Sequence, residues 1–536
     1  LSSLFKVFPD VEPQEEHIQA SAIKGEYFSF QIAYRSKKLI KKVLLSIESD
    51  LKENISLYSV GLVPSGLPCY PDHDEFLLRT EPGLYPDPLY PVKEYVSAQP
   101  KQWQALWVTV KVPRDIIPGV HKIKIIFCDE EGKYLNSRIF KLEIIDAVLP
   151  EQKLIHTEWF YTDCLATWYN VEAFSDEHFK IIEKYIECYV EHGMNMILTP
   201  LFTPPLETEV GKERPTTQLV KVIKREDNYS FDFSLLDRWV KLCLGRGIKY
   251  FEFCHLFTQW GAKHAPKVMS EVDGKVEQVF GWETDATGEE YSNFLLQFMS
   301  ALKGFIRARG LESCVYFHIS DEPGLDDIGN YKKARELVSS DFPVMDALSD
   351  YEFYKKGLVD CPVASTEHIG TFIDNHVKSL WAYYCCCEYK KLSNRFFNMP
   401  SARTRIIGMQ LYKYGINGFL HWGFNHWYSQ KSLYRIDPFK VTDAGHAFPS
   451  GDAFLVYPGD DGPITSIRLK LMREAMQDIC ALELLESTAG KDYVMGILER
   501  TGPLTFTEYE RDSSWLLNTR EMINDAIKKM ETCING

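Results

Sequence analysis

The sequence lacks the short motifs that mark several large enzyme classes. It has no GxGxxG or GxxxxGK loop, so neither a dinucleotide-binding fold nor a phosphate loop is indicated. It has no HExxH motif and no CxxC pair, which argues against a zinc protease and a structural zinc site. No run of about 18 apolar residues occurs, so we expect no transmembrane helix. We therefore expect no cofactor and no metal ion.

Positive charge is scarce relative to negative charge. Lys and Arg number 60 against 75 Asp and Glu, which gives a net charge of −15. This balance repels nucleic acid phosphates and anionic membrane surfaces, so we expect neither as a partner. Aromatic residues make up 13% of the chain, which suits a sugar-binding cleft as well as a large core. The sequence indicates nothing about oligomeric state.

Cysteine is present in an odd number, 13 residues, and Cys385, Cys386 and Cys387 are consecutive. Thiols on apolar segments, such as Cys188 and Cys243, are typical of small core residues. Free thiols of this kind indicate a reducing compartment. No signal peptide is recognisable, so the expected location is cytoplasmic, although the chain begins without Met and is compatible with a trimmed N-terminus.

Two sequence patterns divide the chain. Residues 1–150 contain short alternating strands separated by Pro and Gly, for example 122–127 and 140–144, which predicts an N-terminal β-sandwich. In residues 151–460 strands alternate with helices, and eight such units predict a catalytic (β/α)8 barrel of the TIM type. Residues 461–536 predict a C-terminal helical segment packing on the barrel. A doubly wound sheet is the alternative for the middle region, but its phosphate loops are absent.

The barrel strands are expected at 154–161, 194–200, 248–256, 315–319, 343–348, 362–365, 380–384 and 418–422. Barrel enzymes keep their chemistry at the C-terminal ends of such strands. These ends carry aromatic rings, acids and neutral hydrogen-bonding groups, which suits a neutral polyhydroxylated ligand. The candidate binding residues are Trp159, Tyr161, Asp163, His255, Gln259, Trp260, His318, Trp381, Tyr383, Tyr384, Trp422 and Asn425. For each aromatic residue, packing of the barrel top is the alternative.

Two adjacent carboxylates, Asp321 and Glu322, follow the fourth strand, and Pro323-Gly324 ends it. Adjacent residues of a strand point to opposite faces, so the pair can share a cleft only where the strand breaks. Neighbouring carboxylates cannot readily flank a sugar from opposite sides. They can serve a substrate-assisted reaction, in which the 2-acetamido oxygen of the sugar attacks C1. The alternative is one loop-facing charge and one helix N-cap.

The segment His318-Ile319-Ser320-Asp321-Glu322-Pro323 resembles the signature of glycoside hydrolase family 123, the β-N-acetylgalactosaminidases. Residues 159–164, 198–205, 255–261 and 457–468 resemble blocks of the same family. The resemblance implies a β-sandwich before a (β/α)8 barrel. It also implies retaining, substrate-assisted release of terminal β-linked N-acetylgalactosamine from glycans or glycolipids. The segment after Arg468 is less acidic and aromatic than that family leads us to expect.

The resemblance implies that Asp321 and Glu322 are the catalytic pair. We expect Glu322 to be the general acid and Asp321 to orient the acetamide and carry the charge of its N–H. Trp422 is the first choice for the ring under the sugar, and Trp381 is the second. One of two tyrosines, Tyr383 or Tyr384, is expected to donate to the acetamide oxygen.

Two other functions are considered. In a two-step retaining hydrolase, Glu322 is the acid/base and Glu367 or Glu388 is the nucleophile, so no acetamido group is needed. A barrel that binds carbohydrate without activity is the second, and the intact carboxylate pair argues against it.

Overall fold

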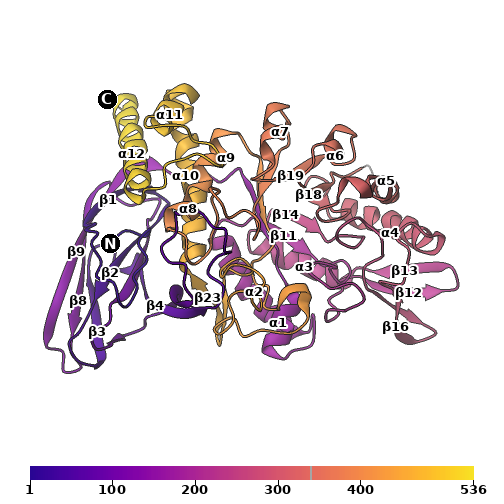
Figure 1. Ribbon diagram of the computed structural model, residues 1–536, viewed down its shortest axis with the longest axis horizontal. Coiled ribbons are helices and arrows are strands. Elements are labelled where there is room, and N and C mark those ends of the chain that lie inside the picture. The colour runs from indigo at the N-terminus through magenta and orange to yellow at the C-terminus, as the bar shows by residue number, and fades with distance from the viewer. Residues whose placement is uncertain (339–340, 536) are drawn as a thin grey trace.

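The computed structural model describes residues 1–338 and 341–535. Strands of the N-terminal region form a sandwich at one end of the molecule, and a parallel barrel forms the other end (Figure 1). The last helices, drawn in yellow, lie against the sandwich and its junction with the barrel (Figure 1). The predicted fold class, a β-sandwich followed by a (β/α)8 barrel and C-terminal helices, is confirmed.

Two sheets form the sandwich, and they enclose one apolar core. The first sheet has the order β1-β9-β8-β3-β6 and the second the order β2-β7-β4-β5-β23-β22. Buried residues of both sheets meet between them, including Phe30, Val108, Ile123 and Leu142. The strands predicted at 122–127 and 140–144 pair with each other, since Ile123 lies opposite Phe140. The strands are β1 Gln19–Lys24, β2 Tyr27–Tyr34, β3 Ile40–Glu48, β4 Ile55–Ser65, β5 Gly83–Pro91, β6 Tyr95–Ala98, β7 Gln104–Lys111, β8 Gly119–Cys128, β9 Tyr134–Val148, β22 Tyr457–Gly459 and β23 Gly462–Ser466.

Eight parallel strands form the barrel, one at each predicted position. They are β10 Ile155–Glu158, β11 Met196–Thr199, β14 Tyr250–Phe253, β17 Val315–Phe317, β18 Met345–Leu348, β19 Cys361–Ser365, β20 Trp381–Tyr383 and β21 Gly418–His421. One sheet runs β10-β21-β20-β19-β18 and another runs β11-β14-β17. The two are joined by a parallel bridge between Phe317 and Val344 and by the Asn195 amide, which donates to the His156 carbonyl at 3.1 Å.

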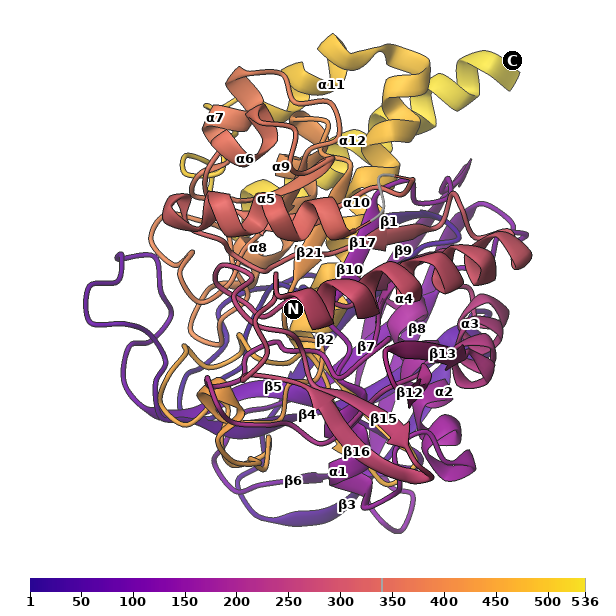
Figure 2. The same ribbon diagram turned by 90° about the vertical axis from the view of Figure 1, so that its right-hand side faces the viewer.

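Helices connect the barrel strands and cover the outside. They are α1 Thr162–Tyr169, α2 Asp176–Glu191, α3 Ser234–Gly245, α4 Glu289–Ala308, α5 Ile328–Leu337, α6 Glu352–Lys355, α7 Ile369–Asp374, α8 Ser401–Arg405 and α9 Ile407–Lys413. The α2 helix begins after Ser175, whose hydroxyl accepts the amide of His178. Figure 2 shows α4 and α5 on the barrel side of the molecule.

The long loops after β11 and β14 carry a small sheet of their own. Its strands are β12 Lys221–Arg225, β13 Asn228–Asp232, β15 Val268–Val272 and β16 Lys275–Phe280, in the order β13-β12-β15-β16. In Figure 2 its β15–β16 hairpin faces the viewer. This sheet ties the two loops together beside the barrel mouth.

The C-terminal region joins the sandwich as well as the barrel. The β22–β23 hairpin extends the sandwich sheet through β5, and the largely buried helix α10 Ile467–Ala489 follows it. Helices α11 Lys491–Leu498 and α12 Ser513–Asn535 end the chain. In α12 the Asn524 amide donates to the Ser21 hydroxyl of β1 at 2.9 Å. The division of the chain at residues 150 and 460 therefore stays a prediction, since the last segment contacts both larger parts.

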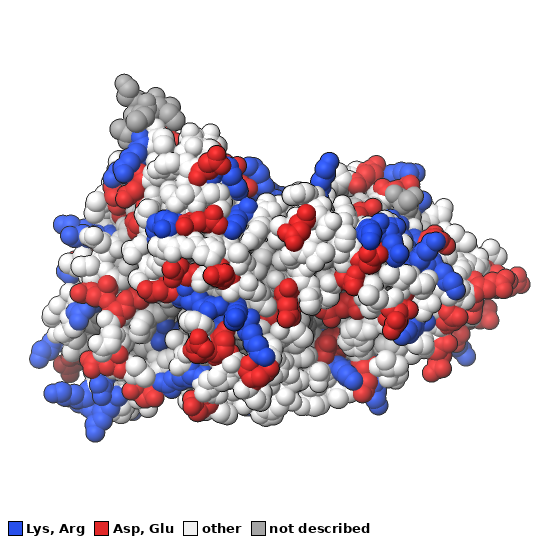
Figure 3. Space-filling model, turned by 45° about the horizontal axis from the view of Figure 1, so that its top comes forward, with Lys and Arg blue, Asp and Glu red and all other residues white. Residues whose placement is uncertain are grey.

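On the face shown in Figure 3, acidic and basic side chains are interspersed. Among the helices of residues 1–338 and 341–535, none is both long enough and apolar enough to cross a lipid bilayer.

Candidate active site

A cavity of about 220 Å³ lies at the C-terminal ends of the barrel strands. Predicted residues that line it are Trp159, Gln259, Trp260, Asp321, Glu322, Tyr383 and Trp422. The remaining lining residues are Glu207, Ala347, Cys385, Cys386, Cys387, Leu420, Gln430, Lys431 and Phe448. The mouth of the barrel thus holds the adjacent acids and an aromatic lining, as the sequence predicts.

The strand that precedes the two acids ends earlier than predicted, and this break brings them together. Strand β17 stops at Phe317, because the next amides do not bond backbone carbonyls of a neighbouring strand. The amides of Ile319 and Ser320 donate to the side-chain carboxylate of Asp346 instead. Glu322 then has a left-handed backbone with φ of 45°, which is uncommon for a residue with a side chain. Both Asp321 and Glu322 therefore line one cavity rather than opposite faces of a strand.

Each of the two acids is bonded to a neutral donor. The Gln259 amide nitrogen donates to Asp321 Oδ2 at 2.7 Å, and the Tyr383 hydroxyl donates to Glu322 Oε1 at 2.7 Å. Burial, and next the charge of Glu322, raise the pKa of Asp321 well above its ordinary value. Burial also raises the pKa of Glu322, since the cavity walls surround the side chain even though solvent reaches it through the mouth. The pair is suited to hold and transfer a proton.

His318 lies beneath the cavity and does not line it, contrary to the prediction that it binds substrate. Its Nδ1 lies 2.8 Å from Asp346 Oδ1 and its Nε2 lies 2.7 Å from Glu252 Oε1. Although burial lowers the pKa of His318, its two carboxylate partners raise it to about 10. The ring is therefore an imidazolium between two carboxylates. The same Glu252 oxygen accepts Trp159 Nε1 at 2.6 Å, so this network also fixes one ring of the cavity wall.

His255 is likewise buried below the cavity rather than in it. Its ring stacks on that of His318 with 4.1 Å between centroids, and burial together with the His318 charge holds its pKa well below the ordinary value. His255, His318 and Asp346 place possible metal ligands within 4.8 Å of one another. Because both ring nitrogens of His318 already bond carboxylates, we interpret this group as an ion-pair network rather than a metal centre.

Three predicted binding residues lie beside the cavity and do not line it: Tyr161, Asp163 and Asn425. The Asp163 carboxylate accepts two nitrogens of the buried Arg214 guanidinium at 2.7 to 2.9 Å, and this guanidinium lies over the Tyr161 ring. Asn425 exchanges hydrogen bonds with the backbone amide and carbonyl of Tyr161 at 2.8 and 3.0 Å. These residues hold the loops after β10, β11 and β21 together.

Two further predicted binding residues point away from the cavity. Trp381 begins β20 and fills the barrel interior beneath the mouth, over Gly418, where an added Cβ would lie 2.1 Å from the ring. Tyr384 is directed outward to α10, and its hydroxyl contacts Met472 Sδ at 3.5 Å. Of the two tyrosines considered as donors, only Tyr383 reaches the cavity, because adjacent residues of β20 face opposite ways.

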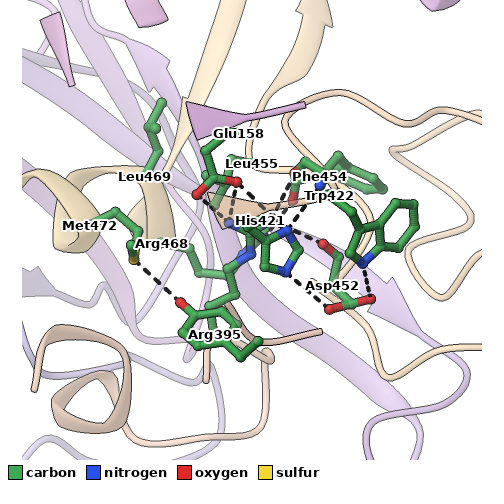
Figure 4. Close-up of polar contacts among 12 residues, drawn as sticks. Glu158, Arg395, His421, Trp422, Asp452, Phe454, Leu455, Arg468, Leu469 and Met472 are labelled. Atoms are coloured by element: carbon green, nitrogen blue, oxygen red, sulfur yellow. Dashed lines mark hydrogen bonds and ion pairs between the residues drawn. The ribbon is translucent and has the colours of Figure 1, made fainter. Parts of the chain in front are cut away.

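Trp422 lines the cavity and is held from behind by a buried network (Figure 4). Its Nε1 donates to Asp452 Oδ2 at 2.9 Å, and the other carboxylate oxygen lies 3.3 Å from His421 Nε2. The His421 Nδ1 accepts a guanidinium nitrogen of Arg395 at 2.6 Å, and Arg395 pairs with Glu158 at 2.7 Å. The plane of Trp422 is therefore fixed by the barrel interior.

Sequence reasoning missed several lining residues. Glu207 lies in the long loop after β11, where its amide donates to Gln259 Oε1 at 2.5 Å and its Oε1 accepts the Lys431 amide at 2.6 Å. Burial raises the pKa of Glu207. No sequence motif singles out this glutamate. Phe448 and Lys431 come from the irregular segment after β21, where no periodic signal exists.

A barrel whose mouth holds paired acids and aromatic rings is typical of an enzyme that hydrolyses glycosides. Residues 159–485 match the family model for the catalytic domain of glycoside hydrolase 123, which is more than half of the chain. The chain therefore belongs to glycoside hydrolase family 123. No match was found among curated proteins.

One solved structure shares the fold over almost the whole chain. A family 123 glycoside hydrolase from Clostridium perfringens, described in work on glycolipid glycan hydrolysis, is 17% identical with a TM-score of 0.73, covering 95% of this chain and 92% of its own. A putative beta-galactosidase from Bacteroides fragilis is 10% identical with a TM-score of 0.33, covering 85% of this chain and 60% of its own. This second likeness is too weak to bear on fold or function.

Proposed function

We propose that this glycoside hydrolase releases terminal β-linked N-acetylgalactosamine from glycans or glycolipids, with retention of configuration, by substrate-assisted catalysis. One observation carries the proposal: the adjacent acids Asp321 and Glu322 share one cavity, and each is bonded to a neutral donor. Membership of family 123 supports it. So does the Clostridium perfringens relative, whose structure was studied for glycolipid glycan hydrolysis.

Asp321 takes the role of orienting the acetamide of the sugar. A carboxylate that accepts the acetamide N–H strengthens its hydrogen bond as positive charge develops on that group, and such differential binding raises the rate. The Gln259 amide holds Oδ2 of Asp321, which leaves Oδ1 to face the substrate. The fixed carboxylate also aligns the acetamide oxygen below C1, which adds a positioning effect.

Glu322 takes the role of general acid and later general base. Its raised pKa keeps a proton available above the ordinary range of a carboxyl. When Glu322 is protonated, the Tyr383 hydroxyl no longer needs to stabilise a carboxylate there, and it can donate to the acetamide oxygen instead. The Trp422 ring offers an apolar face to the C–H side of the sugar.

The positions of the other acids favour this mechanism over a two-step one. Glu367 is exposed and lies outside the cavity lining. Glu388 is buried, and its carboxylate accepts the backbone amide of Cys385 at 2.8 Å. Neither of the nucleophiles considered from the sequence therefore lines the cavity, whereas Glu207 is a third acid that does.

The test compares aryl β-N-acetylgalactosaminides whose acetyl group carries zero, one or three fluorine atoms. Fluorine weakens the acetamide oxygen as a nucleophile, so the rate should fall steeply with each step, and hexosides lacking the acetamido group should be poor substrates. Equal rates across the series would contradict the proposal. Labelling of Glu207 by a 2-fluoro sugar would instead indicate a carboxylate nucleophile.

A variant of Glu322 separates the role of general acid from the acetamide-orienting role of Asp321. Glu322→Gln should abolish cleavage of substrates with poor leaving groups and spare activated aryl glycosides, because only the former need a proton. Equal loss on both substrate types would count against Glu322 as the acid. A protein that binds the sugar but cleaves neither type would be an inactive carbohydrate-binding barrel.

A further inference from the structure

Three consecutive cysteines form part of the cavity wall, and the proposed hydrolysis uses none of them. Cys385, Cys386 and Cys387 follow β20 and all line the cavity that holds Glu322. All three are free thiols. Their sulfur atoms lie within 4.8 Å of one another, and Cys386 Sγ is 4.0 Å from Cys387 Sγ. We call these residues the thiol trio.

The backbone of the thiol trio is held in place by buried polar side chains. The Glu388 carboxylate accepts the Cys385 amide at 2.8 Å, and the Asn394 amide donates to the carbonyls of Cys385 and Glu388 at 2.8 and 2.7 Å. Asn394 is fully buried and Glu388 nearly so. The loop therefore keeps its shape while the three sulfurs line the cavity, which is what a binding site requires.

The spacing of the sulfurs suits one metal ion. Zinc binds thiolate sulfur at about 2.3 Å, so two ligands of a tetrahedral centre lie about 3.8 Å apart. The sulfurs of the trio, which lie within 4.8 Å of one another, are thus at most about 1 Å farther apart than that value. Thiolates select soft and borderline ions such as zinc, cadmium and copper(I) over magnesium or calcium.

We propose that the thiol trio is a binding site for a single thiophilic metal ion, and that an ion bound there blocks the active-site cavity. On binding, three S–H bonds lose their protons to solvent and three metal–sulfur bonds form, with no change of oxidation state. The fourth coordination position faces the cavity, where water or the Glu322 carboxylate can occupy it. An ion there competes with substrate for space and with the proton of Glu322.

The test is a metal titration of the full chain, reduced with a phosphine and freed of metal by chelation. Cadmium binding is followed by thiolate-to-metal absorption, and zinc affinity by competition with a chromophoric chelator. We expect one ion per chain, and reversible inhibition that a chelator relieves. Each Cys→Ser change in the trio should weaken binding by at least the roughly 10–100-fold that loss of a supporting partner costs.

The matched control is Cys361→Ser, because Cys361 is a half-buried thiol at the start of β19, the end of the strand away from the mouth. It should bind and be inhibited like the parent, with inhibition measured against each variant's own metal-free activity. Undiminished binding in the variant lacking all three thiols would overturn the site. Binding at full occupancy without loss of hydrolysis would overturn the block, and neither result depends on which glycoside the enzyme prefers.

Discussion

Asp321 of the cavity and Asp478 at the junction of barrel and sandwich are both buried but have different partners. At the junction, Asp478 of α10 bonds two nitrogens of Arg405 at 2.7 and 2.8 Å and one of Arg520 at 2.9 Å. Burial raises the pKa of Asp478, but the two guanidinium charges outweigh it and hold the pKa below its ordinary value. In the cavity, by contrast, Asp321 and Glu322 bond a neutral amide and a neutral hydroxyl, and their pKa values rise.

This difference in partners separates acids that stabilise the fold from acids that are suited to proton transfer. A carboxylate paired with cations stays ionised and binds distant segments together, as Asp478 joins α8 to α12. A carboxylate held only by neutral donors keeps a proton that it can give away. Below the cavity, Glu252 and Asp346 bond the His318 ring, which lowers the pKa of Asp346, but burial outweighs this effect and raises that pKa overall. Hence the charge of the partners, in addition to burial, separates Asp478 from the two acids of the cavity.

The largest expected effect comes from Asp321→Asn. The substitution keeps the shape of the side chain but removes the charge that stabilises the acetamide in the transition state. We expect kcat to fall by about 10²–10⁴, the range for losing one such group. Azide should not rescue the variant as an inverted glycosyl azide, because Asp321 never bonds C1. Steady-state kinetics and product analysis check this, and a covalent sugar on another acid would refute it.

Removal of the junction acid should damage stability instead of chemistry. Asp478→Ala leaves Arg405 and Arg520 buried with fewer partners, which costs about 3–5 kcal/mol of unfolding free energy. Because the pKa of Asp478 is lowered, its contribution is present above the ordinary Asp value and is lost as the pH falls. Denaturant unfolding measures the loss. The control Asp146→Ala breaks an exposed pair with Lys24 and should cost at most about 1 kcal/mol.

A substitution of Trp422 tests whether this ring, which is bonded to Asp452, also contacts the sugar. Trp422→Ala removes an apolar face worth about 1.5–3 kcal/mol, so kcat/KM should fall by roughly 10–150-fold. Trp381→Phe is the contrast, since Trp381 fills the barrel interior below the mouth. It should lower the unfolding midpoint and leave KM near that of the parent. A Trp422→Ala enzyme with unchanged kinetics would show that this ring only packs.

Sequence patterns predicted the elements well but not the direction of every side chain. The period of the strands placed all eight barrel strands, and Pro323-Gly324 indicated the break at the acids. They could not show that Tyr383 faces the cavity while Tyr384 faces α10, since a one-residue shift in register reverses the two. They also could not show that His318 is enclosed by Glu252 and Asp346, because those partners come from other strands.

The smallest expected effect concerns Glu207, the acid that sequence reasoning missed. Burial contributes most to the raised pKa of Glu322, and the negative charge of Glu207 adds to it. The alkaline limb of the pH–rate profile reports the loss of the Glu322 proton. Glu207→Gln removes one negative charge near that acid, so the pKa of Glu322 should fall and the alkaline limb should move to lower pH.

The control for this shift is Glu209→Gln, which changes an acid on the same loop that does not line the cavity. Its alkaline limb should coincide with that of the parent when kcat/KM is measured from acid to alkaline pH. An equal shift in both variants would mean that the loop acts through its overall charge. An unmoved limb in Glu207→Gln would mean that Glu322 is not the group whose ionisation ends activity, and the contrast between neutral and cationic partners would then lose its functional meaning.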